Sequence, residues 1–526
     1  MEQIERDTRS EAGAHNGRLG KLKGLVAIGA MLGLAMLGVW WATPSIWAQS
    51  RDRRPMAFSA PPGLHLPLVF DEAALGPTPA LPTPPALPSP GPAPTLEPSG
   101  GRLSLVSVSP AGDPADADCL APALSADGRY VAFASAAANL LPTGADGWMH
   151  LFRIDLQTGT RERLDSEDAH IPGAVAGHAG RSALSADGRV VAFESAAPLA
   201  AGDRNSTYDI YIWREGAEEA DQNPADQNPA DQNPADQNPL VRAGLPPFGE
   251  LSQGAERPVL SANGALLAFD SASPELLPGG GTIGERGVFV QDLVTGVIVR
   301  VSLDVAGPSL RPAMSADGRF IAFQVVGDNP ALGDRNGMDD IYLYDGARGR
   351  TTRVSQAWEG GDSDGPSFAP AISGDGRFVA YVSAATNLVD GDINGLADIL
   401  VFDRAIGLTE RVSVGAGAAR PAANGPSDRP ALSADGRYVA FCSEATNLVP
   451  GDTNGVADVF LFDRATGTMV CLSQGYDGRP ADGPSYWPAI SADGDTVVFV
   501  SEAGNLLPPA SGGTERRKQV YVWKRD

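Results

Sequence analysis

The sequence has little cysteine, little histidine and too few basic residues to balance its acidic ones. Three Cys in 526 residues exclude a disulfide framework and a cysteine-rich metal fold. Five His leave little material for a multi-histidine metal centre. The 40 Lys and Arg against 64 Asp and Glu give a net charge of −24, which argues against nucleic acid as a partner, because phosphates require a basic surface.

Glycine and proline, in contrast, are abundant. The chain has 62 Gly and 44 Pro, far more than a helical protein tolerates. Because both residues break helices and mark turns, the composition favours many short strands.

One uncharged apolar run lies near the N-terminus. Residues 24–43 are long enough for a helix to cross a bilayer, with Trp40 and Trp41 at the far end, where indoles favour the interface. The sequence therefore predicts a single-pass membrane anchor, with residues 1–23 as a short cytoplasmic tail. The alternative is a signal peptide cleaved after Ala48, which would release a secreted protein.

A proline-rich stretch follows the apolar run. Residues 76–98 read GPTPALPTPPALPSPGPAPTLEP, a composition that builds neither a sheet nor a core. We therefore expect residues 44–100 to form an extracytoplasmic linker that carries residues 101–526 away from the membrane.

The remainder of the chain is repetitive. The motif SADGR, or a close variant, recurs at intervals of about 60 residues. A fixed period of this length indicates a solenoid or a propeller. The seven copies begin at Ser125, Ser185, Ser261, Ser315, Ser373, Ser433 and Ser491.

Each repeat contains four short strand patterns. In the sixth copy, residues 429–433, 438–443, 458–463 and 469–473 are apolar or alternating segments separated by Gly and Asp turns. Four such strands make one antiparallel sheet, which cannot bury both faces alone. Seven of them arranged radially can, so the sequence predicts an all-β, seven-bladed β-propeller.

The two ends of the repeat region complement each other. The last repeat ends with its third strand at residues 520–523, whereas residues 103–109 match the fourth strands of the other repeats. We therefore expect the N-terminal strand to complete the last blade and to close the ring, leaving no open sheet edge.

The pattern xPxxSxDGRxhAFxS followed by DIY resembles the TolB-type, WD40-like (PD40) β-propeller repeats of bacterial envelope proteins. Matches include residues 311–319 with 340–342, and residues 369–377 with 398–399. The resemblance covers residues 102–526 and implies the propeller fold. The small N-terminal domain that accompanies the propeller in TolB has no counterpart here.

The loops between the second and third strands carry the sharpest constellation of polar residues. In four blades their Asp and Asn residues are spaced D-x-N-x-x-x-D, with Gly after the Asn in three of them, and this spacing resembles the first nine positions of an EF-hand calcium loop. The carboxylate normally found at position 12 is absent, since Val401 occupies it in the fifth blade. Plain turn chemistry is therefore the alternative to calcium. The candidate ligands are Asp203, Asn205, Asp209, Asp334, Asn336, Asp340, Asp390, Asp392, Asn394, Asp398, Asp452, Asn454 and Asp458.

The loops from fourth to first strands share this face and add further carboxylates. We expect an acidic rim that either contacts a protein or another envelope ligand, or simply keeps the molecule soluble. The added carboxylates are Asp362, Asp364, Asp428, Asp477 and Asp482. The SADGR turns, present once per blade, are expected to be structural.

The sequence offers few features of an enzyme. It has no GxSxG, HExxH or glycine-rich phosphate loop. The alternative is a polysaccharide-active lyase or hydrolase, and His150, His170 and His178 are the only histidines of the repeat region. A convergent cluster of His, Arg and carboxylate at the central channel would favour this alternative, whereas small and apolar residues there would favour binding.

The repetitive stretch DQNPADQNPADQNPADQNP, within residues 217–239, is predicted to be a disordered insert in the second blade. Taken together, the sequence predicts a membrane-tethered, extracytoplasmic binding or scaffold propeller without catalytic residues, with Ca²⁺ as the candidate cofactor.

Overall fold

The computed structural model describes residues 100–141, 148–165, 179–197, 199, 207–216, 240–244, 251–276, 285–417, 420–508 and 516–526. The chain divides into two compact units, 1–67 and 68–526, and every described residue belongs to the second. The predicted tail, anchor and insert, and all of the linker except its last residue, lie outside the described residues. Among the described residues, no helix combines the length and apolar character needed to cross a membrane.

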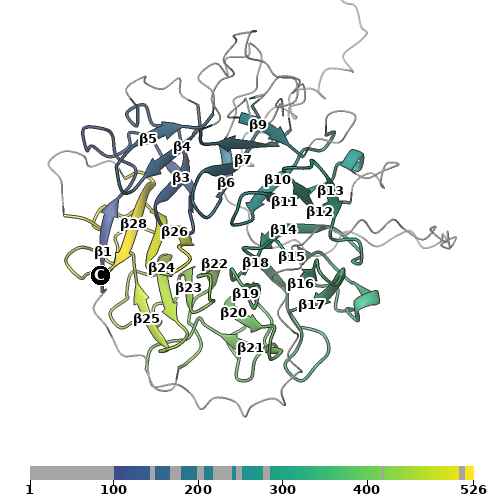
Figure 1. The fold of residues 1–526 in the computed structure, drawn as a ribbon. Helices are drawn as coiled ribbons and strands as arrows, with labels where there is room; N and C mark the ends of the chain where they lie inside the picture. The colour runs from purple at the N-terminus through teal and green to yellow at the C-terminus, as the bar shows by residue number, and fades with distance from the viewer. Residues whose placement is uncertain are drawn as a thin grey trace, which may run out of the picture. The chain divides into compact units, whose positions relative to one another are not determined.

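The described residues form seven antiparallel sheets of four strands, arranged as the blades of a propeller (Figure 1). We number the blades by their first appearance in the chain. Two short 3₁₀ turns, η3 (Pro274–Leu276) and η4 (Pro330–Leu332), lie in loops. The strands are β2 (Cys119–Leu124), β3 (Tyr130–Ser135), β4 (His150–Asp155) and β5 (Arg161–Arg163) in blade 1; β6 (Ala179–Leu184), β7 (Val190–Ser195), β8 (Asp209–Arg214) and β9 (Leu240–Ala243) in blade 2; β10 (Glu256–Leu260), β11 (Leu266–Ser271), β12 (Gly287–Asp292) and β13 (Ile298–Arg300) in blade 3; β14 (Ser309–Met314), β15 (Phe320–Val325), β16 (Asp340–Asp345) and β17 (Arg350–Arg353) in blade 4; β18 (Ser367–Ile372), β19 (Phe378–Ser383), β20 (Asp398–Asp403) and β21 (Leu408–Arg411) in blade 5; β22 (Ser427–Leu432), β23 (Tyr438–Ser443), β24 (Asp458–Asp463) and β25 (Thr468–Cys471) in blade 6; and β26 (Ser485–Ile490), β27 (Thr496–Ser501), β28 (Gln519–Arg525) and β1 (Gly101–Leu105) in blade 7.

The predicted closure of the ring is confirmed. β1 pairs with β28 in antiparallel register, from Gly101 opposite Arg525 to Leu105 opposite Tyr521. The first strands of consecutive blades contact each other all the way round, including β26 with β2. In Figure 1 the purple β1 accordingly lies beside the yellow β28.

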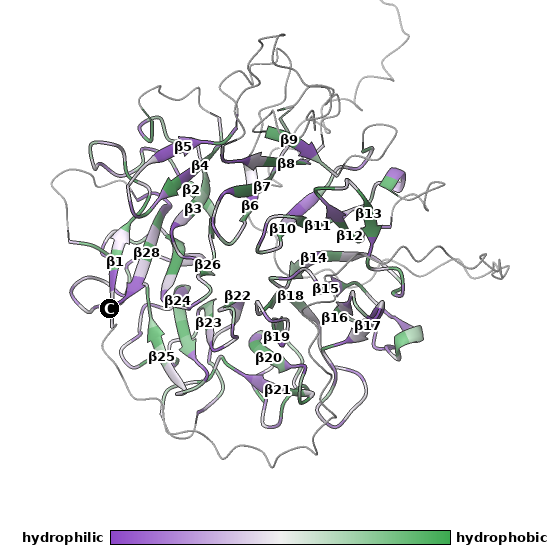
Figure 2. Ribbon diagram, viewed as in Figure 1, coloured by the Kyte–Doolittle hydropathy of each residue, from purple (hydrophilic) through white to green (hydrophobic). Residues whose placement is uncertain are grey.

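The hydrophobic core lies between neighbouring blades and is supplied mainly by the middle strands. β3, β19, β23 and β27 are buried along their whole length. Within six blades an aromatic ring of the second strand packs against one of the third, as Phe441 does on Phe460 with ring centroids 5.9 Å apart. Figure 2 shows the hydrophobic colour concentrated on these strands. Each blade therefore needs both neighbours to bury its two faces.

The turns between first and second strands have the structural role that the sequence predicts. In blade 6 the Ser433 hydroxyl donates to Asp435 at 2.7 Å, and Gly436 has φ +67. A Cβ on Gly436 would collide with the ring of Phe378 in the preceding blade. The turns also join one another through a closed ring of backbone hydrogen bonds, which runs from Ala492 N to Ala126 O where the last blade meets the first. This ring ties the seven blades together at one end of the propeller axis.

Candidate functional site on the loop face

The opposite end of the propeller is formed by the loops between second and third strands and by those between fourth and first strands. We call this the loop face. Antiparallel pairing places both kinds of loop at the same end of every blade. All the predicted calcium ligands belong to these loops or to the strand ends next to them. Asp203 and Asn205 lie outside the described residues, and Asp390 is exposed at the start of its loop.

In blade 4 the predicted carboxylates surround an arginine of the fourth strand. Nη1 of Arg353 lies 3.1 Å from Oδ1 of Asp334 and 3.8 Å from Oδ2 of Asp340. Tyr342 donates its hydroxyl to Asp334 at 2.7 Å. Burial raises the pKa of Asp340 to about 6, although its hydrogen bonds and Arg353 oppose this rise. The guanidinium therefore supplies, within the fold, the positive charge that a bound cation would bring.

Blade 5 repeats this arrangement. Nη1 of Arg411 lies 2.9 Å from Oδ1 of Asp392 and 3.7 Å from Oδ2 of Asp398. In blade 2 the equivalent pair is Arg242 and Asp209, 2.7 Å apart and both buried. The fourth-strand arginine thus accompanies the Asp that begins the third strand in all three blades.

In these loops each asparagine side chain makes hydrogen bonds with both its amide NH2 group and its amide oxygen. Asn394 donates to Asp398 at 2.8 Å and accepts the N–H of Leu396 at 2.9 Å. Asn336 and Asn454 make the same two kinds of bond. In the structure these side chains therefore serve the turn and orient the following carboxylate.

Blade 6 keeps both carboxylates but lacks the arginine. Cys471 occupies the position of Arg411, because it pairs with Phe460 as Arg411 pairs with Leu400. Asp458 accepts hydrogen bonds from Asn454 at 2.7 Å and from Ser473 at 2.5 Å. Oδ1 of Asp452 is buried without a hydrogen-bond partner. No basic side chain of the described residues forms an ion pair with either carboxylate.

The absence of a counter-charge affects the ionisation of both groups. Burial raises the pKa of Asp452, and burial together with the nearby Asp452 raises the pKa of Asp458 to about 6. Burial also raises the pKa of the Cys471 thiol, so this side chain is neutral. Two carboxylates without an ion-pair partner therefore lie in the blade 6 loop, at the position where blades 4 and 5 place a guanidinium.

The blades that lack the Asp and Asn pattern differ at the Asp that begins the third strand, and blade 7 differs at the fourth-strand arginine as well. In blade 1, His150 begins the third strand, and its Nδ1 lies 2.7 Å from Oδ2 of Asp165. In blade 3, Gly287 replaces the Asp, and burial lowers the pKa of Arg300. In blade 7, Gln519 takes the place of the Asp and Leu105 that of the arginine. Within the described residues, blade 6 is the blade that retains the carboxylate pair without a cation.

The predicted acidic rim is partly neutralised. Most of its carboxylates lie next to an arginine, as Asp362 does at 2.8 Å from Arg353 and Asp482 at 3.1 Å from Arg516. Among the described residues, no three His, Cys, Asp or Glu side chains form a group that could hold a metal ion. A cation on this face would therefore complete its coordination with backbone oxygens and water. His170 and His178 lie outside the described residues.

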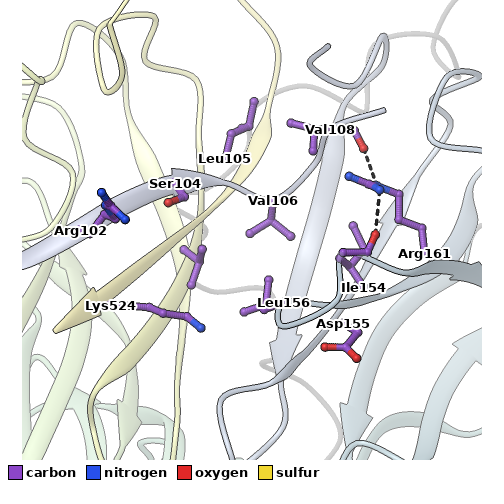
Figure 3. Close-up of a pocket in the computed structure, with 12 residues that line it drawn as sticks. Arg102, Ser104, Leu105, Val106, Val108, Ile154, Asp155, Leu156, Arg161 and Lys524 are labelled. Atoms are coloured by element: carbon purple, nitrogen blue, oxygen red, sulfur yellow. Dashed lines mark hydrogen bonds between the residues drawn. The ribbon is translucent and has the colours of Figure 1, made fainter. Parts of the chain in front are cut away.

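A cleft of about 300 Å³ lies at the seam where the last blade meets the first (Figure 3). Two of the charged side chains on its wall are already engaged. Arg161 donates to the carbonyls of Val108 and Gly159, both at 2.8 Å, and Asp155 pairs with Arg129 at 2.7 Å. The cleft is therefore part of the ring-closing contact.

Sequence reasoning missed a cluster of arginines on the innermost strands, which we call the axial arginines: Arg181, Arg257, Arg311 and Arg429. Each lies at the β-bulge that interrupts the first strand of its blade. The signal was present in the repeat, because the residue before the Pro of xPxxS is Ala, Arg or Trp in different blades.

No family model matches this chain, and no curated protein matches it. Many solved structures do. TolB from Acinetobacter baumannii is 14% identical, with 69% of this chain and 67% of that chain covered and a TM-score of 0.37. The β-propeller domain of the Trilobed protease from Pyrococcus furiosus is 11% identical, with 77% and 95% covered and a TM-score of 0.45. Oligogalacturonate lyase from Vibrio parahaemolyticus is 12% identical, with 81% and 97% covered and a TM-score of 0.46. At these identities the likeness concerns the fold alone.

Proposed function

We propose that this chain is a non-enzymatic binding or scaffold propeller of the cell envelope, tethered by residues 24–43 with the blades on the extracytoplasmic side. Its contact surface for a protein or another envelope ligand is the loop face, and Ca²⁺ bound between Asp452 and Asp458 orders that face in blade 6. The observation that carries the proposal is the carboxylate pair of blade 6, which lacks the arginine present in blades 4 and 5.

The distribution of exposed hydrophobic side chains supports the loop face as the contact surface. Large apolar side chains that stay in water often mark interaction sites, and aromatic residues are enriched at interfaces. Of the twelve such side chains among the described residues, eight lie in loops of this face. They are Trp148, Tyr208, Leu303, Val326, Met338, Trp358, Ile393 and Tyr476.

The electrostatics of blade 6 support a cation rather than an unpaired acid. A buried carboxylate without a counter-charge is costly, and its pKa rises as a result. Calcium binds carboxylate, carbonyl and water oxygens in flexible geometry, so two Asp side chains would supply its charged ligands. In blades 4 and 5 the guanidinium fills this role, which explains why the same loop needs no metal there.

Thermal unfolding of residues 101–526 in EGTA, in millimolar Ca²⁺ and in millimolar Mg²⁺ tests the proposal. A ligand that binds only the folded state stabilises it by about 2.7 kcal/mol at one hundred times its Kd. We expect a calcium-specific rise in Tm of about 2–5 °C. Identical melts in the three conditions would contradict the calcium site and leave the loop as a plain turn.

Two reciprocal substitutions make the test specific to blade 6. In Cys471→Arg the new guanidinium should occupy the position between Asp452 and Asp458, so the calcium response should disappear while stability in EGTA increases. In Arg411→Cys the blade 5 carboxylates lose their cation, so the protein should be less stable in EGTA and should respond more strongly to calcium. A calcium response that persists in Cys471→Arg would place the ion elsewhere.

The pKa of Asp458 predicts the pH dependence of the calcium effect. The folded value, about 6, lies above the ordinary 3.8, so the folded state holds the proton more tightly. Without metal, the contribution of this group to stability is full below about pH 4 and is lost as pH rises to about 6. The raised pKa corresponds to about 3 kcal/mol. We therefore expect Asp458→Asn to be more stable than the wild type at pH 8 in EGTA, and the calcium effect to vanish at pH 5.

The measurement is a set of melts of both proteins between pH 4.5 and 8, with and without calcium. Comparison with Asp458→Asn removes the contributions of carboxyls whose pKa is lowered by arginine, such as Asp403 beside Arg377. A calcium effect of equal size at pH 5 and pH 8 would exclude Asp458 as a ligand.

A further inference from the structure

The axial arginines of blades 2, 3 and 4 are connected by shared carboxylates. Glu194 accepts the backbone N–H of Arg181 at 3.1 Å and that of Arg257 at 2.9 Å. Asp270 accepts a hydrogen bond from the guanidinium of Arg257 at 2.9 Å and another from the backbone N–H of Arg311 at 3.1 Å. These bonds cross from one blade to the next, so the three arginines form one continuous wall on neighbouring innermost strands.

The bulge in each first strand takes these residues out of the regular alternation of the strand. Arg257 and Arg311 have φ values of +57 and +56, in the left-handed region that non-glycine residues rarely adopt. Ala121, Ala369 and Trp487 occupy the same position in other blades with similar φ. The backbone geometry is therefore part of the repeat, and a bulge of this kind re-aims a side chain. What changes from blade to blade is the side chain presented.

Polar and acidic residues beside the bulge distinguish blades 2 to 4 from the other blades. The second-strand residue next to the bulge is Glu194, Asp270 or Gln324 in blades 2 to 4. In blades 5, 6, 7 and 1 the same position holds Val382, Cys442, Val500 and Ala134. In Figure 2, the beginning of β10 is coloured hydrophilic. A feature restricted to three consecutive blades is not required to build the propeller.

The charges on this wall do not cancel. Arg257 and Arg286 share Asp270, and both also pair with Glu256, at 3.4 Å and 2.6 Å. Arg181 and Arg311, in contrast, form no ion pair with any described residue. Burial and the like charges of Arg257 and Arg181 lower the pKa of Arg311, and Arg429 of blade 6 adds to this effect. Arg311 is thus within electrostatic reach of arginines in blades 2 and 6, which do not adjoin blade 4, and Asp428 of blade 6 partly offsets their effect.

Solvent reaches the cluster, since Arg181 is exposed and Arg311 is half-buried. At the other end of the innermost strands, the ring of backbone hydrogen bonds between the turns draws the chain together. A ligand would therefore approach from the loop face. The backbone N–H groups on the wall are already taken by Glu194 and Asp270, so the wall offers guanidinium groups rather than main-chain donors.

We propose that the axial arginines bind a small multivalent oxyanion, carrying at least two carboxylate or phosphate groups, with Arg181 and Arg311 as its principal contacts. Arg181 and Arg311, which form no ion pair within the described residues, fit two anionic groups, because arginine binds carboxylate and phosphate through paired hydrogen bonds. This proposal is independent of the calcium site.

The test is titration calorimetry of residues 101–526 at low ionic strength, with citrate and pyrophosphate as probes and acetate as the monovalent control. Calcium is first removed with EGTA, and the EGTA is then dialysed away, because EGTA itself carries several carboxylate groups and would compete with the probes. We expect citrate or pyrophosphate, but not acetate, to bind, and the stronger of the two identifies the preferred chemistry. Absence of binding by both would overturn the proposal.

Two variants locate the site and separate binding from folding. Arg311→Gln should weaken binding of the preferred probe at least tenfold, and Arg181→Gln, which alters an exposed side chain, should do the same. Without the probe, Arg311→Gln should melt at the same or a higher temperature than the wild type, because repulsion among the arginines is relieved. Arg479→Gln, an exposed loop variant whose side chain is 82% accessible, is the control. Unchanged affinity in both axial variants would overturn the proposal.

Discussion

Asp270→Ala is expected to lower the free energy of unfolding by about 3–5 kcal/mol. The carboxylate of Asp270 is fully buried and accepts hydrogen bonds from Arg257, Arg286 and the backbone of Arg311. Its removal leaves two guanidinium groups, each 23% exposed, with only Glu256 to balance them. The arginines would then repel each other in the interior of blades 3 and 4. Chemical denaturation followed by tryptophan fluorescence measures the loss.

The size of this effect depends on burial, which a matched pair of variants can show. Asp477 and Arg479 form a similar contact at 3.4 Å on the surface, where side chains are 34% and 82% exposed. Surface pairs contribute about 0–1 kcal/mol, so Asp477→Ala should be nearly neutral. Asp270→Asn keeps a hydrogen-bond acceptor, so its loss of unfolding free energy should lie between those of Asp270→Ala and Asp477→Ala. Equal effects of Asp270→Ala and Asp477→Ala would show that the buried network does not hold blades 3 and 4 together.

The architecture was predictable because the repeat encodes it many times over. Each blade contains its own turn motif and alternating strands, so errors at one position are corrected by six other copies. The closure followed from counting strands at the two ends, and the pairing of β1 with β28 confirms it. The observed strand, Gly101–Leu105, begins two residues earlier than the matching pattern at residue 103, because pairing with β28 extends it.

The interior of the loop sites was less accessible from the sequence. The spacing of Asp392, Asn394 and Asp398 describes one loop, whereas Arg411 lies on the next strand and reaches the carboxylates only through the pairing of β20 with β21. The loop alone therefore left calcium and plain turn chemistry as the two alternatives and gave no sign of an internal guanidinium. Comparing fourth strands between repeats would have shown that Cys471 stands where other blades have arginine.

The axial arginines were missed for a different physical reason. Alternation with period two assigns every side chain to one of the two faces of a strand. It cannot predict a residue that leaves this alternation. A bulge with positive φ takes Arg257 and Arg311 out of it. The residue before a proline normally prefers extended backbone, so no local sequence signal indicates this conformation.

Deletion of residues 101–109 from the propeller is the second change with a large expected effect. The deletion removes β1, which carries the half-buried Leu103 and Leu105, and also the buried Val106 that follows it. Loss of these three apolar contacts should destabilise the fold by about 3–6 kcal/mol. β28 would also become an open edge, which favours association between molecules. Chemical denaturation measures the stability, with buried Trp523, opposite Leu103, as the reporter, and light scattering measures association.

The closing strand acts through its pairing, so it should also act when supplied separately. A synthetic peptide of residues 100–110 should restore most of the lost stability in the truncated protein, because it can occupy the edge of β28 and cover the same apolar surface. The same peptide with Leu103, Leu105 and Val106 replaced by Ser keeps the backbone hydrogen bonds but not the apolar contacts, and it should fail. If the truncated protein were as stable as the intact one, blade 7 would be held by its three remaining strands and by its contacts with the neighbouring blades, through β2 on one side and β22, β23 and β24 on the other.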